Sequence, residues 1–378
     1  MTAGQAQFPL APSMFTFAQH GHSGMWISEL LPNIAKMSDD LCFIRSMKTD
    51  AINHEPAITF LQTGNQVTGR PCLGAWASYG LGSMNEDLPT FVVMVARPTN
   101  QEQMQAISAR LWSSGALPGA HAGVSFRTSG DPILFLENPR GVSDAVRRRT
   151  LDGIGELNQR LLDDIGDPQT RTRMEQYELA YRMQLEASDA FDLSKEPDHI
   201  SDLYGRATHG RQTLIARRLL ERGVRYIQLW HGKSQPWDHH DNIRDNHAKL
   251  ARELDQPVAA LLKDLKQRGM LEDTLVIFGG EFGRTPMFQG KGGAGRDHHI
   301  KGFSMWMAGG GVKPGMSYGE TDELGYNAAK DIVHVRDFHA TLLHLLGIDH
   351  HRFSTKFQGL DMRLTGVEPA KVIKQLLA

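Results

Sequence analysis

This sequence has few cysteines, no long apolar run and no excess of basic residues. Each of these features argues against one class of protein. The 378 residues include Cys42 and Cys72 as the two cysteines, which argues against a disulfide framework or a cysteine-ligated zinc site, although one bridge would be possible. No apolar run approaches the roughly 18 residues that a membrane helix needs, so we expect no membrane partner. The formal net charge is -2, and without a basic excess we expect no nucleic-acid partner.

The N-terminal segment lacks a secretion signal as given. The opening MTAGQAQFPLAPSMF has no basic region followed by an apolar core, which predicts a cytoplasmic protein. Residues 1–24 contain proline, glutamine and glycine without a clear period, and they predict an N-terminal arm. The next segment, WISELLPNIAKMSDD, has apolar residues at helical spacing and predicts a helix.

Apolar runs alternate with helical patterns along most of the chain. LCFIRSM, LPTFVVMVA, VRYIQLW, LVIF and FSMWMA predict strands, and the segments between several of them have helical spacing. Runs that are apolar throughout are typical of strands covered on both faces. This alternation predicts an α/β fold with a mostly parallel sheet and helices on both faces.

Residues from about 101 to 210 depart from that alternation. A loop-rich stretch is followed by two polar helical segments, at about 144–165 and 168–187, whose apolar residues recur every three or four positions. That spacing predicts one buried face on each helix. We interpret the region as a helical excursion within a single domain that covers 1–378.

Acidic and imidazole side chains follow two of the predicted strands. Asp238, His239 and His240 come after VRYIQLW, Glu281 comes after LVIF, and a second Asp-His-His triplet lies in the next loop. Ligands of open α/β sheets bind at the carboxyl ends of the strands, so these loops predict one site. Carboxylate with imidazole suits zinc or manganese, whereas a site dominated by oxygen would favour calcium or magnesium.

One such triplet alone is typical of a solvated loop, but two with a carboxylate between them favour a metal site. Adjacent residues point in different directions, so not all of them can bind one ion. The candidate metal ligands are Asp238, His240, Glu281, Asp297 and His298. His239 and His299 would orient the ligands or lie at the surface.

Two further residues are candidates for the chemistry itself. Arg284 could bind an anionic ester through two parallel hydrogen bonds, or form a salt bridge within its loop. His54 lies in NHEP, just before a predicted helix. It could be a nucleophile, a general acid, a metal ligand or a structural loop residue.

Several motifs together resemble a known bacterial family. WDHHDN, GGEFGRTP, GRDHH, AGGGVKPGMSYGETDELGYN and HVRDFHATLLHLLGID are similar to the family called domain of unknown function 1501, from about Phe17 to the C-terminus. The resemblance implies the alkaline phosphatase and sulfatase superfamily. It therefore implies a three-layer αβα sandwich with a mostly parallel sheet and a helical insertion, and hydrolysis of phosphate or sulfate esters at one or two metal ions.

The resemblance also assigns roles to single residues. Asp238 and His240 match the mid-chain metal loop, Glu281 matches the carboxylate of a later Asp-His pair, and His298 matches the final ligand histidine. NHEPAITFLQTG is similar to the helix that carries the sulfatase nucleophile.

Three departures accompany these matches. His54 stands where sulfatases keep a modified Cys or Ser, and Phe282 stands where the superfamily has a metal-binding His. The superfamily also takes an Asp from a first strand near the N-terminus, and the chain resembles a member without that strand. If the strand and an export signal precede the sequence, the resemblance implies a periplasmic or exported protein.

The sequence therefore predicts a metal-dependent hydrolase of sulfate or phosphate esters. Its cofactor would be a divalent ion, namely zinc, manganese or calcium, and its partner a small anionic ester substrate. A non-catalytic binding or scaffold member of the same fold is the alternative, because the usual nucleophile and one ligand are replaced. A phosphotransferase similar to phosphoglycerate mutase is less favoured, since it would need a serine nucleophile.

Overall fold

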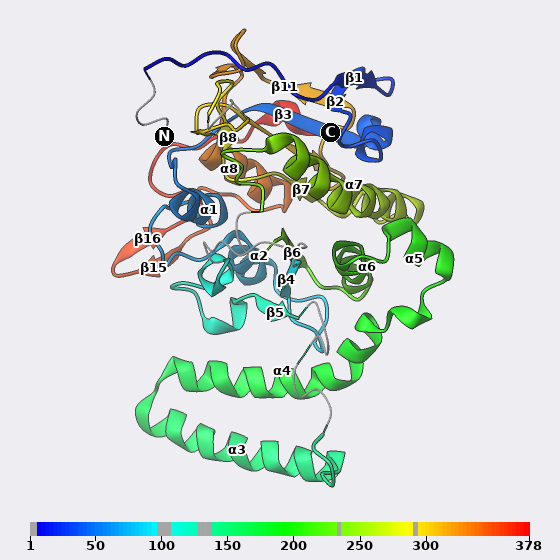
Figure 1. The fold of residues 1–378 in the computed structure, drawn as a ribbon. Coiled ribbons are helices and arrows are strands. Elements are labelled where there is room, and N and C mark those ends of the chain that lie inside the picture. The colour runs from blue at the N-terminus through cyan, green and yellow to red at the C-terminus, as the bar shows by residue number, and fades with distance from the viewer. Residues whose placement is uncertain (1–5, 97–106, 128–132, 134–137, 233–235, 290–293) are drawn as a thin grey trace.

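The chain forms a mixed α/β structure in which helices flank several sheets (Figure 1). The computed structural model describes residues 6–96, 107–127, 133, 138–232, 236–289 and 294–378. Among these residues, no helix combines the length and apolar character that crossing a bilayer requires.

The helices and strands lie close to most of the predicted segments. The helices are η1 (Ile34–Asp40), α1 (His54–Thr63), α2 (Leu73–Leu81), η2 (Ala109–Trp112), η3 (Gly119–His121), α3 (Asp144–Ile165), α4 (Pro168–Phe191), η4 (Leu193–Lys195), α5 (Asp198–Tyr204), α6 (Thr208–Glu221), α7 (Ile243–Gln267), α8 (Val335–Leu345) and η6 (Lys374–Leu376). The strands are β1 (Phe17–His20), β2 (Met25–Ser28), β3 (Leu41–Lys48), β4 (Phe91–Ala96), β5 (Val124–Phe126), β6 (Tyr226–His231), β7 (Val276–Phe278), β8 (Gly283–Arg284), β9 (His298–His299), β10 (Phe303–Ala308), β11 (Met316–Tyr318), β12 (Glu320–Thr321), β13 (Ala328–Lys330), β14 (Val333–His334), β15 (Thr355–Phe357) and β16 (Leu360–Met362).

The strand pairing is more mixed than the expected mostly parallel sheet. One sheet, in the order β5-β4-β6, is parallel throughout. The larger sheet has the order β11-β3-β10-β7, with β14 also paired to β3, and β10 runs antiparallel to both of its neighbours. The described residues between β7 and β10 form no helix, and a parallel connection normally needs a crossover of that kind.

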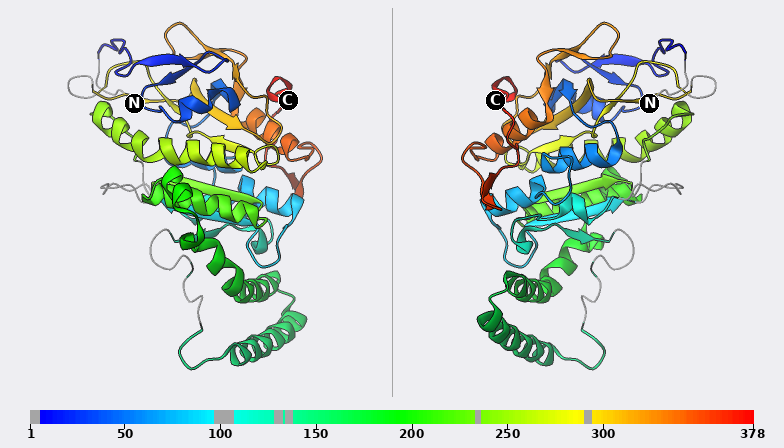
Figure 2. Two further views of the ribbon diagram at one scale, coloured as in Figure 1. Left: turned by 90° about the vertical axis from the view of Figure 1, so that its right-hand side faces the viewer. Right: turned by 90° about the vertical axis from the view of Figure 1, so that its left-hand side faces the viewer.

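Helices cover both faces of the two sheets, as the two side views in Figure 2 show. Alternate residues of β3 belong to different core clusters: Cys42 and Ile44 pack with residues of α1, α2 and α8, whereas Leu41 packs with α7. On β4, Val93 faces the first of these clusters and Val92 packs with α6. The expected α/β class is therefore confirmed, with apolar strands buried from both sides.

The N-terminal region differs from its prediction. Phe17–His20 lies within the expected arm but pairs with Met25–Ser28 as a short antiparallel hairpin. The segment predicted as one helix is therefore a strand followed by the 3-10 helix η1. The Asp255 carboxylate on α7 accepts hydrogen bonds from the backbone N–H groups of Asn33 and Ile34. This distant cap fixes where η1 begins, and local spacing cannot reveal it.

The two long polar helices form a hairpin that projects from the sheets (Figures 1 and 2). Helix α3 packs on α4, and α4 packs on α6 and η3. Both helices begin at the predicted residues, with Ser143 and Asp167 as side-chain caps. The predicted buried face of α3 is wrong, because no side chain of this helix is buried.

A buried ionic network anchors the end of this hairpin. The Arg217 guanidinium, on α6, is 2% exposed and contacts Glu196 at 2.6 Å, Glu221 at 2.5 Å and Asp264 at 3.1 Å. Arg218 also pairs with Glu196 and donates to the carbonyl of Ala190 in α4. A buried pair that loses one partner leaves an uncompensated charge, so this network holds α4 firmly against α6 and α7.

Burial of His339 makes the fold sensitive to acid. The ring, on α8, donates from Nε2 to the carbonyl of Leu61 at 2.7 Å, and burial lowers the pKa of His339 to about 4. An unfolded histidine has a pKa near 6.5, so the unfolded state binds the proton first as the pH falls. We expect the contribution of His339 to stability to be full above about pH 6.5 and to fall by up to about 3 kcal/mol by about pH 4.

Urea unfolding at several pH values tests this expectation. His339→Gln can keep the hydrogen bond to Leu61 without titrating, so its free energy of unfolding should vary less between about pH 7 and pH 5 than that of the parent chain. His351→Gln, at an exposed position, is the matched control and should keep the parental slope. An unchanged slope in His339→Gln would contradict the assignment.

Candidate metal centre

Three loops deliver the candidate side chains to one place. His54 is the first residue of α1, which follows β3 after a short loop. Asp238 lies in the loop between β6 and α7. His298 begins β9, which pairs with β8 so that Arg284 and His298 lie opposite each other. Strand ends therefore bring together residues that are up to 244 positions apart in the sequence.

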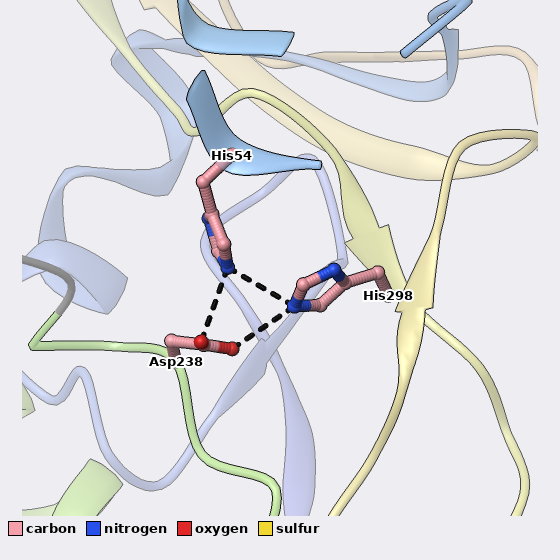
Figure 3. A group of neighbouring side chains, drawn as sticks. All are labelled: His54, Asp238 and His298. Atoms are coloured by element: carbon pink, nitrogen blue, oxygen red, sulfur yellow. Dashed lines mark hydrogen bonds and ion pairs between the residues drawn. The ribbon is translucent and has the colours of Figure 1, made fainter. Parts of the chain in front are cut away.

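His54, Asp238 and His298 form a group that could hold a metal ion (Figure 3). One ligand atom from each lies within 4.8 Å of the others. His54 Nε2 is 3.0 Å from His298 Nε2 and 3.2 Å from Asp238 Oδ2. His298 Nε2 is 3.1 Å from Asp238 Oδ1. Both imidazoles and the carboxylate are partly buried, so the surrounding protein limits the access of water.

The outer nitrogens of the two imidazoles already have partners. His54 Nδ1 lies 2.5 Å from Glu281 Oε1, and His298 Nδ1 lies 3.0 Å from the carbonyl oxygen of Ile52. A carbonyl or a carboxylate can only accept, so each Nδ1 must donate. Neutral imidazole carries one proton, and Nε2 of each ring is therefore left with its lone pair.

The inward-facing atoms are consequently all acceptors. Two lone pairs 3.0 Å apart face a carboxylate, and this arrangement is unfavourable unless a proton or a cation lies between them. Burial lowers the pKa of His54, but Asp238 and Glu281 outweigh burial and hold that pKa above its usual value. The pKa of Asp238 is far below its usual value, because His298, His54 and Arg284 outweigh the effect of burial. The donor set thus fits a divalent metal ion.

His240 and Arg284 surround the same carboxylate. His240 Nε2 lies 3.0 Å from Asp238 Oδ1, and its Nδ1 lies 2.7 Å from Gln289 Oε1. Arg284 donates to Asp238 Oδ1 at 2.5 Å and to the carbonyl of Arg296 at 3.2 Å. The His240 side chain is 40% exposed, which places it at the rim. Asp238 is therefore the common contact of His54, His240, Arg284 and His298.

Phe282 supports the imidazoles from one side. Its ring centroid lies 4.8 Å from that of His54 and 4.7 Å from that of His298. A phenyl ring supplies no metal ligand, but packing against two imidazoles restricts their rotation. Phe282 therefore forms an apolar wall of the cluster.

Three of the predicted ligands lie outside the group of His54, Asp238 and His298: His240 at its rim, and Glu281 and Asp297. Glu281 accepts a hydrogen bond from His54 Nδ1, on the side of the ring that faces away from Asp238, and it therefore orients the imidazole. Asp297 is 3% exposed, and its Oδ1 accepts from the backbone N–H of its neighbour His298. His239 and His299 are buried away from the cluster, with the rings of His247 and Tyr326 as neighbours. Sequence spacing alone cannot separate these cases, because it does not fix side-chain direction.

Contacts from Ile52 and Gln289 were not among the predictions. The first is a backbone carbonyl next to the NHEP motif, and the second lies eight residues after Glu281. Neither has a local signal, since its role depends on an imidazole from another loop.

Gly295 lies where the backbones of the two loops that carry the Asp-His-His triplets come into contact. A Cβ atom there would lie 1.8 Å from the carbonyl oxygen of His240 and 2.7 Å from the backbone nitrogen of Asp241. The adjacent carbonyl of Ala294 accepts from the N–H of Ile243 at 3.0 Å. Glycine is required here because backbone meets backbone without space for a side chain.

Gly295→Ala should weaken metal binding by separating the loops. Loss of supporting contacts around a metal typically costs about 10-fold to 100-fold in affinity, and we expect a change of that size for zinc, measured by titration calorimetry. Gly280→Ala is the matched control, because a Cβ at Gly280 meets nothing within 4 Å. Equal zinc affinities in the two variants would show that the close approach does not shape the site.

Comparisons with known proteins identify the family to which the chain belongs. No curated protein matches the chain. Two solved structures are similar to it, each with a TM-score of 0.37 and 84% of this chain covered: Ps i-CgsB in complex with k-i-k-neocarrahexaose, at 12% identity, and the phosphonate monoester hydrolase SpPMH from Silicibacter pomeroyi, at 13% identity. The match spans 66% of the first protein and 68% of the second. The family model described as protein of unknown function (DUF1501) matches residues 2–377, and the chain therefore belongs to the DUF1501 family.

Proposed function

We propose that the chain is a metal-dependent hydrolase of sulfate or phosphate esters, of the alkaline phosphatase and sulfatase type. One observation carries the proposal: the Nε2 atoms of His54 and His298 converge with the Asp238 carboxylate, within the distances over which one metal ion could contact all three. Each imidazole is held from behind by an oxygen acceptor. This is the arrangement by which proteins orient histidines toward a metal.

The donor set favours zinc or manganese. Two imidazoles and one carboxylate are borderline ligands, whereas calcium is usually bound by six to eight oxygens. When bound, such an ion polarises an ester oxygen and lowers the pKa of a water molecule. Asp238 and Glu281 would provide the negative charge that offsets the ion, directly and through His54.

The surroundings of the triad favour an anionic substrate. Arg284 lies next to Asp238 with a planar guanidinium that can bind two oxygens of a sulfate or phosphate group. Helix α1 starts at His54, and the Asn53 side chain makes no capping hydrogen bond. The first N–H groups of α1 therefore add positive potential at the same place.

Water is the nucleophile that this geometry favours. Burial raises the pKa of Cys42 to about 11 and that of Cys72 to about 12, so both thiols stay protonated. His54 was a candidate nucleophile or general acid. Its Nδ1 faces Glu281, and its Nε2 faces Asp238 and His298. We therefore assign His54 to metal binding and Arg284 to substrate binding within this proposal.

A non-catalytic binding member is the second candidate. Phe282 packs on His54 and His298 and supplies no ligand, which favours a site with one metal ion. Such a site could bind an anionic ester without cleaving it.

Metal content tests the foundation of both candidates. After dialysis against zinc or manganese and then against buffer, the parent chain should retain about one equivalent by inductively coupled plasma measurement. Asp238→Asn and His298→Gln should each lose at least about 10-fold in affinity. His22→Ala, which removes an exposed histidine far from the triad in sequence, should bind as the parent does. A parent chain without retained metal would contradict the proposal.

Hydrolysis separates the enzyme from the binding protein. The parent chain loaded with zinc or manganese should cleave nitrophenyl phosphate or nitrophenyl sulfate, and Asp238→Asn should reduce the rate by at least about 100-fold. Arg284→Gln should raise KM without loss of the metal, because the guanidinium holds the anion. Equal rates in the parent and Asp238→Asn, with the metal retained by the parent alone, would favour the binding protein.

A further inference from the structure

Helix α3 carries an apolar stripe that nothing in the described chain covers. All five of its members are exposed by at least a third of their surface: Val146 by 42%, Ile154 by 37%, Leu157 by 65%, Leu161 by 44% and Ile165 by 68%. They recur at intervals of eight, three, four and four residues along the 22-residue helix. Such spacing places them on one side of the helix, and an apolar face of this length usually packs against another element.

Helix α4 does not cover this stripe. The contacts between the two helices run through Arg148, which pairs with Glu178 at 2.9 Å and lies over the Tyr181 ring at 4.8 Å. Leu151 and Leu162 are half-buried on that side of α3. The apolar stripe is therefore a second, outer face of the hairpin, and the hairpin projects from the sheets (Figure 1).

The charges of α3 are distributed against the helix dipole. Three consecutive arginines, at 147–149, outnumber Asp144 in its first two turns, and Asp163 and Asp164 lie in its last turn, which contains no basic residue. Positive charge near the N-terminus and negative charge near the C-terminus both destabilise an isolated helix. The distribution becomes favourable when a second helix lies antiparallel, because each basic end then meets an acidic end.

Arg149 and Asp164 border the stripe and are available for such a contact. Neither has an ion-pair partner among the residues that the structure describes. In an antiparallel pair centred between Glu156 and Leu157, position 149 of one helix lies opposite position 164 of the other. A second copy of this chain therefore supplies both an apolar stripe and the complementary charges.

We propose that α3 is a dimerisation helix, which packs antiparallel against α3 of a second copy through the apolar stripe. A helix of this length is about 33 Å long and about 10 Å wide, so one face offers on the order of 300 Å². A stable interface takes about 800 Å² from each partner. The α3 pair therefore associates reversibly, and the fraction of dimer depends on concentration. The metal centre lies at the strand ends, away from the hairpin, and takes no part in this contact.

Sedimentation velocity of the full chain tests the proposal. The parent chain should be mainly monomeric at about 1 µM and mainly dimeric at about 100 µM. Leu157→Asp should remain monomeric at the higher concentration. Leu360→Asp changes a leucine that is 75% exposed on β16, and it should dimerise as the parent does. A monomeric parent at both concentrations, or loss of the dimer in both variants, would overturn the proposal.

Charge reversal tests the antiparallel arrangement. Arg149→Glu and Asp164→Arg should each weaken self-association by about 10-fold, because each places like charges opposite one another. An equimolar mixture of the two variants should regain the parental affinity, since each basic position then faces an acidic one. Circular dichroism of each variant confirms that the helices are retained. Undiminished self-association of either variant would exclude the antiparallel pairing.

Discussion

Asp238 is the point on which the candidate site depends. Its carboxylate lies within 3.2 Å of nitrogens from His54, His298, His240 and Arg284. These partners come from three separate loops, so one carboxylate sets the distance between the ends of β3, β6 and the β8–β9 pair. The neutral imidazoles of His54 and His298 present lone pairs to it rather than protons. Arg284 already places one positive charge on the carboxylate, and the two Nε2 lone pairs beside it form a position that a metal ion could occupy.

Much of the framework follows from local sequence. The runs that form β3, β4, β6, β7 and β10 are rich in apolar residues, and β3 and β4 bury such residues on both faces. The starts of α3 and α4 follow from Ser143 and Asp167, whose side chains satisfy the first N–H groups. The position of Asp238 and His298 in loops after strands also predicted that they lie at one site, whereas His54 was assigned to that site only through the resemblance of its helix to the sulfatase nucleophile helix.

Other features depend on contacts between distant residues. The segment before β3 has helical spacing, but β2 pairs with β1 and Asp255 caps η1 from α7. Glu281 and Asp297 occupy the same loops as true members of the cluster, yet one faces the far side of His54 and the other faces a backbone N–H. The spacing of α3 indicates an apolar face, but spacing cannot tell whether the chain itself covers that face.

The network around Arg217 gives the hairpin a further property, which concerns ionic strength. Arg217 and Glu196 have side chains only 2% and 6% exposed, so dissolved ions cannot reach the space between them. Arg149 and Asp164 border an exposed face, where salt of about 0.15 M already screens charges beyond about 8 Å. Salt therefore weakens the interactions of the exposed charges on the α3–α4 hairpin but leaves the buried ionic network intact. The hairpin keeps its position on α6 while the electrostatic attraction at its outer face falls as the ionic strength rises.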